Sequence, residues 1–142
     1  MTTFAARQSV DQQIHYLRFV VNYNDTSISG GARSYGALPA GAIIVGTDVY
    51  INTVFNAGTT NVLTVGTNTT TSNNIIAAAD VDETATGLTQ NVKPTGTALG
   101  PLSADIDVYV KYAQTGTAAT TGKAYIIIKY VTDNDTGSAL AS

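Results

Sequence analysis

The stretch that decides the fold class reads Ile106-Asp107-Val108-Tyr109-Val110-Lys111-Tyr112. Its even positions are aliphatic or aromatic, whereas its odd positions include Asp107 and Lys111. Side chains of a β-strand point alternately to its two faces, so this pattern predicts a strand with one buried face and one face in water. A loop at 115–122 follows. The apolar run at 125–131 then predicts a return strand that completes a β-hairpin.

The segment 43–55 carries the longest strand signal of the chain. Both of its alternating faces contain apolar side chains, which predicts a strand in the middle of a sheet. In this interpretation Ile43 and Val45 share a face with the other odd-numbered residues, and Gly46 marks a bulge or bend. After a turn, residues 62–66 are predicted to return as the second strand of another hairpin.

Weaker signals predict strands at 14–24, 32–38 and 86–92, and the run 75–79 fits either a short strand or a helical turn. About eight short strands without a convincing amphipathic helix indicate an all-β, antiparallel β-sandwich. The paired Cys and the core Trp that mark an immunoglobulin domain are absent. The sequence therefore predicts a jelly-roll-like sandwich.

The chain divides by composition into three parts. Residues 1–12 are predicted to form a polar N-terminal arm, residues 13–132 the sandwich domain, and residues 133–142 a polar C-terminal tail. A length of 142 residues fits one domain. The arm has neither the basic nor the apolar region of a secretory signal, so we expect a protein that is not exported by that route.

The composition removes most of the groups that catalyse reactions or bind metals. The chain has no Cys, no Trp and one His, while Thr occurs 23 times. The net charge is −3 and the seven Lys and Arg are scattered, so the basic patch that nucleic acid requires is missing. No apolar run approaches the roughly 20 residues of a membrane span. We expect no enzyme activity, no cofactor, no metal, no nucleic acid and no membrane partner.

Three residues deserve comparison with catalytic groups. Asp105 and Asp107 lie two apart on one predicted strand face, and paired carboxylates can perform acid–base chemistry when their environments differ. A solvated strand face is the favoured interpretation, because burial is what raises a carboxylate pKa. His15 is the single candidate general base, and a strand histidine with a hydrogen-bond partner is favoured over a catalytic one.

The densest acidic cluster is Asp80, Asp82 and Glu83. Oxygen ligands at alternate positions suit Ca²⁺, but the glycine and the distal glutamate of a calcium loop are missing. We therefore predict a charged turn, or a cluster at a helix N-terminus, in place of a metal site.

Two segments supply candidate interface residues. The segment 30–36 is glycine-rich but has neither the Walker spacing nor the dinucleotide-binding spacing. It reads as a loop in which Arg33 and Tyr35 can anchor a partner, because these residue types are enriched in binding hot spots. In the arm, Phe4 and Arg7 are predicted to serve the same purpose.

Parts of the chain resemble small structural proteins of tailed bacteriophages. The segments that carry the resemblance are 55–67, 75–81, 107–112 and 122–130. The match is to hairpin-like segments, and within that group the chain is most similar to jelly-roll capsid cement, or decoration, proteins. The resemblance implies an inert virion protein on the outer surface of the capsid, made in the cytoplasm of a bacterial host, that staples neighbouring major capsid subunits.

The resemblance also implies self-association, with a homodimer favoured and a trimer as the alternative. The long edge of the strand at 125–131 or the N-terminal arm is the predicted contact, because an uncovered strand edge tends to pair. The second hypothesis is a carbohydrate- or receptor-binding head of a phage fibre, in which some of the eight Tyr stack on sugars. A third is a small glycan-active enzyme that uses Asp105 and Asp107.

Overall fold

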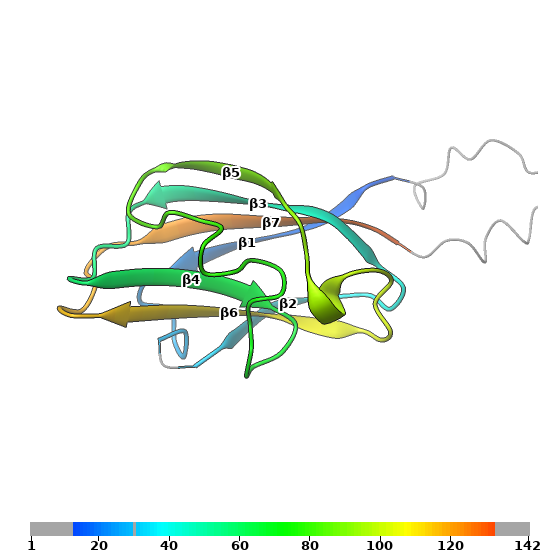
Figure 1. The fold of residues 1–142 in the computed structure, drawn as a ribbon, viewed down its shortest axis with the longest axis horizontal. Coiled ribbons are helices and arrows are strands. Elements are labelled where there is room, and N and C mark those ends of the chain that lie inside the picture. Colours follow the sequence, from blue (N-terminus) through cyan, green and yellow to red (C-terminus); the bar gives the residue numbers. More distant parts are fainter. Residues whose placement is uncertain (1–12, 30, 133–142) are drawn as a thin grey trace, which may run out of the picture.

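The structure is a computed structural model that describes residues 13–29 and 31–132. Within these residues, seven strands form two antiparallel sheets that pack face to face, which confirms the predicted all-β sandwich (Figure 1). The four-stranded sheet has the order β1-β7-β3-β5 and the three-stranded sheet the order β2-β6-β4. The elements are β1 His15–Asn22, β2 Arg33–Leu38, β3 Ile43–Thr53, β4 Thr60–Gly66, β5 Gly87–Val92, the 3-10 helix η2 Gly96–Ala98, β6 Ile106–Thr115 and β7 Lys123–Val131. No helix in these two ranges is long and apolar enough to span a bilayer.

Both predicted hairpins are wrong, because their two strands belong to opposite sheets. β6 lies between β2 and β4, whereas β7 lies between β1 and β3. Likewise β3 pairs with β7 and β5, whereas β4 pairs with β6. Alternation reports which face of a strand is buried, and it carries no information about the hydrogen-bonding neighbour. The loops 54–59 and 116–122 therefore connect the two sheets.

The second of these loops passes directly over a core side chain. At its end, Gly122 has a φ of +152°, and a Cβ there would lie 2.4 Å from Cδ2 of Phe55. The Phe55 side chain is buried, and its ring centroid is 4.9 Å from that of Tyr112. Glycine is required because any larger residue would have to displace this packed ring.

The predicted central position of β3 and its bulge at Gly46 are confirmed, but the bulge changes which side chains are buried. The register with β7 shifts between Ile44 and Gly46. An inserted residue reverses the alternation beyond it. Ile44 is consequently buried, whereas Ile43 and Val45 are 40% and 49% exposed. Regular alternation had placed both on the same face as the buried Val49.

The core lies between the inner faces of the two sheets. Ile126 and Ile128 of β7 point into it and are fully buried, whereas Ile127 lies on the outer face, opposite Asp48 of β3. The predicted buried face of β6 is confirmed by Val108, Val110 and Tyr112. These buried residues of β7 and β6 belong to one hydrophobic core cluster, which forms without any disulfide.

The segment 75–79 is neither a strand nor a helical turn. Ile76 forms one isolated antiparallel bridge with Val65 of β4, and a turn follows. The polar loop before this bridge is held by Asn74, which is buried. Its Oδ1 accepts a hydrogen bond from the backbone N–H of Thr67 at 2.9 Å, and its Nδ2 donates to the Thr67 hydroxyl at 2.7 Å. A loop of low sequence complexity is therefore fixed by buried polar contacts.

Candidate interaction surface

The two aspartates that were compared with a catalytic pair accept hydrogen bonds from nearby residues. Asp105 accepts a hydrogen bond from the backbone N–H of Ala40 at 2.8 Å. The hydroxyl of Tyr109 donates to Oδ2 of Asp107 at 3.3 Å. Both carboxylates are exposed and neither lines the hollow described below. This arrangement favours the predicted solvated strand face over an acid–base pair.

The acidic cluster is split by the fold. The N–H and the hydroxyl of Thr84 both donate to Oδ1 of Asp82, at 3.0 and 2.6 Å, and these bonds lower the pKa of the Asp82 carboxyl. Glu83 is instead buried, with 4% of its surface exposed, and its Oε1 accepts the N–H of Leu63 at 2.7 Å. Burial raises the pKa of Glu83. Glu83 thus lies in a turn, as predicted, but its side chain is buried. The described residues contain no group of three acids, His or Cys that could hold a metal ion.

His15 takes its predicted place at the start of a strand. Its ring is stacked on that of Tyr130, with centroids 5.9 Å apart. Its Nε2 is buried and has no hydrogen-bond partner among the described residues, so the expected partner is not found there. A catalytic triad requires a nucleophile that is hydrogen-bonded to the histidine, and the described residues provide none at this nitrogen.

Arg33 and Tyr35 lie on β2, and the structure gives them different roles. The Tyr35 hydroxyl donates to Asp25, and its ring is stacked on that of Phe19 at a centroid distance of 5.1 Å. Burial, followed by the Asp25 hydrogen bond, raises the pKa of Tyr35 far above its usual range. Arg33 is exposed, and its Cζ lies 5.0 Å from the Tyr35 ring centroid. Outside the described residues lie the other two predicted interface residues, Phe4 and Arg7.

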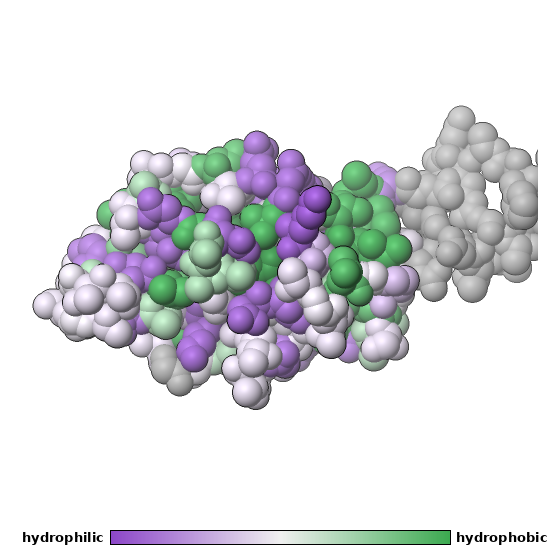
Figure 2. Space-filling model, viewed as in Figure 1, coloured by the Kyte–Doolittle hydropathy of each residue, from purple (hydrophilic) through white to green (hydrophobic). Residues whose placement is uncertain are grey.

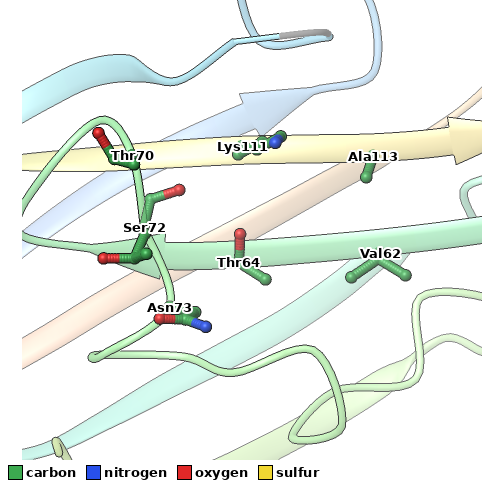
Figure 3. Close-up of a pocket in the computed structure, with 8 residues that line it drawn as sticks. Val62, Thr64, Thr70, Ser72, Asn73, Lys111 and Ala113 are labelled. Carbon is green, nitrogen blue, oxygen red and sulfur yellow. The ribbon is translucent and has the colours of Figure 1, made fainter.

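A shallow hollow of about 220 Å³ lies on the outer face of the three-stranded sheet (Figure 3). Its lining residues are Val62, Thr64, Thr70, Thr71, Ser72, Asn73, Lys111 and Ala113. The loop that follows β4 and contains residues 70–73 packs tightly against Gly66, where a Cβ would lie 2.5 Å from the backbone of Ser72. The lining has hydroxyls but no aromatic ring, so it lacks the stacking platform that the sugar-binding hypothesis requires.

The outer face of the four-stranded sheet gathers aromatic, aliphatic and cationic side chains. We call it the cationic–aromatic face and define it by Arg18, Val20, Tyr50, Leu88, Lys123 and Tyr125. Sequence reasoning considered the eight Tyr as possible sugar-stacking residues, without knowing their neighbours in space.

One row of this face crosses all four strands. Val20 is paired with Tyr125, Tyr125 with Tyr50, and Tyr50 with Leu88. The rings of Tyr50 and Tyr125 are stacked at a centroid distance of 6.2 Å. Leu88 is 56% exposed and Tyr50 is 42% exposed. At a strand spacing of about 4.8 Å, the row presents about 14 Å of continuous apolar and aromatic surface.

Cations flank this row. The Arg18 Cζ and the Lys123 Nζ lie 5.2 and 5.3 Å from the centroid of the Tyr125 ring, which is the geometry of cation–π contacts. The four strands hold a single carboxylate, Asp48, which forms an ion pair with Lys129 at 3.3 Å. Arg18 and Lys123 form no ion pair within the described residues, so the face carries excess positive charge on a protein of net charge −3.

A second apolar area lies at the end of the sandwich where β3 begins and β7 ends (Figure 2). The exposed Ile43 and Val45 belong to the start of β3, and Ile14, 59% exposed, precedes β1. The described chain begins and ends at this same end of the sandwich (Figure 1).

The sequence matches no protein-family model and no curated protein. Its fold matches chains of three solved phage capsids. A chain of the cyanophage Pam1 capsid asymmetric unit has a TM-score of 0.69 at 16% identity, over 93% of this chain and 94% of that one. A chain of the capsid of Ralstonia phage GP4 has a TM-score of 0.61 at 19% identity, over 92% of this chain and 91% of that one. A chain of the acidic stable capsid of Helicobacter pylori bacteriophage KHP30 has a TM-score of 0.59 at 19% identity, over 87% of this chain and 90% of that one. The likenesses establish a shared fold.

Proposed function

We propose that this protein is a structural component of a tailed-phage capsid and that it acts there as a cement, or decoration, protein. The observation that carries the proposal is the likeness to a chain of the Pam1 capsid asymmetric unit over nearly the full length of both chains. In this role the protein lies on the outer surface of the virion and staples neighbouring major capsid subunits.

The side chains of the described residues support adhesion. The acids suggested by the sequence accept hydrogen bonds from nearby backbone N–H or hydroxyl groups, and no metal cluster is formed among residues 13–29 and 31–132. The cationic–aromatic face instead exposes Tyr and Arg, which dominate binding energy at protein interfaces. A sheet also presents these groups on an ordered backbone, which lowers the entropy cost of binding.

A clamp of this kind needs no reaction to stabilise a shell. A protein that binds across the seam between two subunits stabilises the intact shell relative to separated subunits by its binding free energy. Because an icosahedral shell repeats the seam many times, modest individual contacts suffice, and linked copies gain avidity.

Self-association as a homodimer, with a trimer as the alternative, belongs to the same proposal. The predicted contact through the edge of β7 is wrong, because β1 and β3 cover both of its edges. β1 is an outer strand of its sheet and offers eight residues for edge-to-edge pairing with a second copy. The molar mass in solution, measured by light scattering, distinguishes the dimer from the trimer.

The test of the proposed function is binding to phage shells that lack this protein. The purified chain is mixed with such shells, sedimented, and imaged by electron cryomicroscopy. We expect cosedimentation and regular added density on the outer surface. Absence of cosedimentation together with a specific signal on a glycan array would favour the fibre-head hypothesis instead.

The contribution of the N-terminal arm is tested by deleting residues 1–8, which removes Phe4 and Arg7. The sandwich domain is predicted to begin at residue 13, after this polar arm, so we expect an unchanged thermal midpoint. Binding to shells is expected to weaken, because two predicted anchors are lost. Equal binding of the truncated and full chains would rule out the arm as an anchor.

A further inference from the structure

We infer that the cationic–aromatic face is the surface that contacts the capsid, and that its partner is an acidic protein surface with an apolar centre. This inference rests on the proposed function and adds an orientation to it. The sheet β1-β7-β3-β5 then lies against the shell, and the sheet β2-β6-β4 faces the solvent.

The distribution of charge is the first support. Lys129 is neutralised by Asp48 and also donates to Oδ1 of Asn91 at 2.8 Å. Arg18 and Lys123 flank the central row without an ion pair among the described residues. Carboxylates on a partner would complete both pairs, and complementary charge sets the register and speeds the encounter.

The arrangement of the apolar groups is the second support. The row from Val20 through Tyr125 and Tyr50 to Leu88 occupies the middle of the face, with the cations on either side of it. A centre of aromatic and aliphatic groups within a polar surround is the usual anatomy of a protein interface. Cation–π contacts hold Arg18 and Lys123 in place before binding, which lowers the entropy cost of using them.

Other occupants fit this face less well. A two-fold contact between copies through this face would place like cations against each other. A sugar would stack on open rings, but Arg18 and Lys123 already lie over Tyr125, which leaves Tyr50 as the more open ring of the row. A nucleic acid would need several phosphate contacts, whereas the face offers two unpaired cations on a protein of net charge −3.

The test compares two charge-reversed proteins for binding to shells that lack this protein. The first variant, Arg18→Glu with Lys123→Glu, changes the cationic–aromatic face. The matched control, Lys93→Glu with Lys111→Glu, makes the same change in net charge outside the cationic–aromatic face. A third variant, Leu88→Glu, alters the central row at an exposed position whose change costs the fold little. Circular dichroism and thermal melts verify folding of each variant.

We expect the wild type and the control to bind alike, within about twofold, and the first and third variants to bind at least about tenfold more weakly. Binding of the wild type should also weaken as salt rises. Equal binding by all proteins, or a loss confined to the control, would overturn the assignment of the face. Failure of the wild type to bind would overturn the proposed function, and the assignment with it. If the wild type binds a glycan or an oligonucleotide and the first variant does not, the ligand of this face is that molecule and not a protein surface.

Discussion

Ile126→Asp leaves the protein unfolded at room temperature, by our expectation. Its side chain is fully buried on β7, with Phe19 and Val49 as its cross-strand neighbours. Loss of a buried Ile side chain costs about 2–5 kcal/mol, and a carboxylate without a partner in the core adds several more. The sum is comparable to the about 5–15 kcal/mol that stabilise a typical domain. Far-ultraviolet circular dichroism and urea titration measure the loss.

The same substitution one residue later provides the control. Ile127 lies on the outer face between Arg18 of β1 and Asp48 of β3. An aspartate there gains one attractive and one repulsive cross-strand neighbour, so we expect a folded protein with a loss of about 1 kcal/mol. If Ile127→Asp unfolds the chain and Ile126→Asp does not, the inner and outer faces of β7 have been interchanged.

Glu83→Ala is expected to destabilise the protein by about 2–3 kcal/mol, since it leaves a buried donor unsatisfied and opens a cavity. β4 is the outer strand of its sheet, and the N–H of Leu63 points to the Glu83 carboxylate where a neighbouring strand would otherwise accept it. Glu83→Gln retains an accepting oxygen and should cost much less. Urea titration of both variants tests this, and equal losses would show that the hydrogen bond is not the cause.

The buried carboxyl also predicts the sign of a pH effect. Burial raises the pKa of Glu83, so above the ordinary glutamate range the folded state holds this proton more tightly than the unfolded state. Its favourable contribution is complete below pH of about 4 and is lost as the pH rises through the raised pKa. The stability of the wild type relative to Glu83→Gln should therefore fall as the pH increases. A pH-independent difference would contradict this. The titration of Asp82 largely cancels in the comparison, because both proteins contain this residue and its hydrogen bonds to Thr84.

Much of the local structure could be predicted from the sequence. The alternation in β6 and the double-sided apolar pattern of β3 identified a half-buried and a central strand, because a period of two follows from strand geometry itself. Gly46 marked the bulge for the same kind of local reason. The partners of the strands could not be predicted this way, because a hydrogen-bonded neighbour is chosen by contacts between distant segments.

The candidate surface shows the same division. The outward positions of Tyr50 and Tyr125 were open to prediction, since each lies on a clear strand. Their stacking, and the cations over Tyr125, depend on β1, β7 and β3 being neighbours. Arg33 and Tyr35 were selected by residue type alone, and the structure uses Tyr35 to fix β2 against Phe19.

The sequence by itself determined an all-β chain with few reactive groups, because the alternation of side chains and the supply of Cys, His and acids are properties of the chain before it folds. The tertiary structure decided which strands meet, which acid is buried, and which aromatic side chains gather into one row. Each of these depends on atoms that are close in space and far apart in sequence, as in the contact between Glu83 and Leu63.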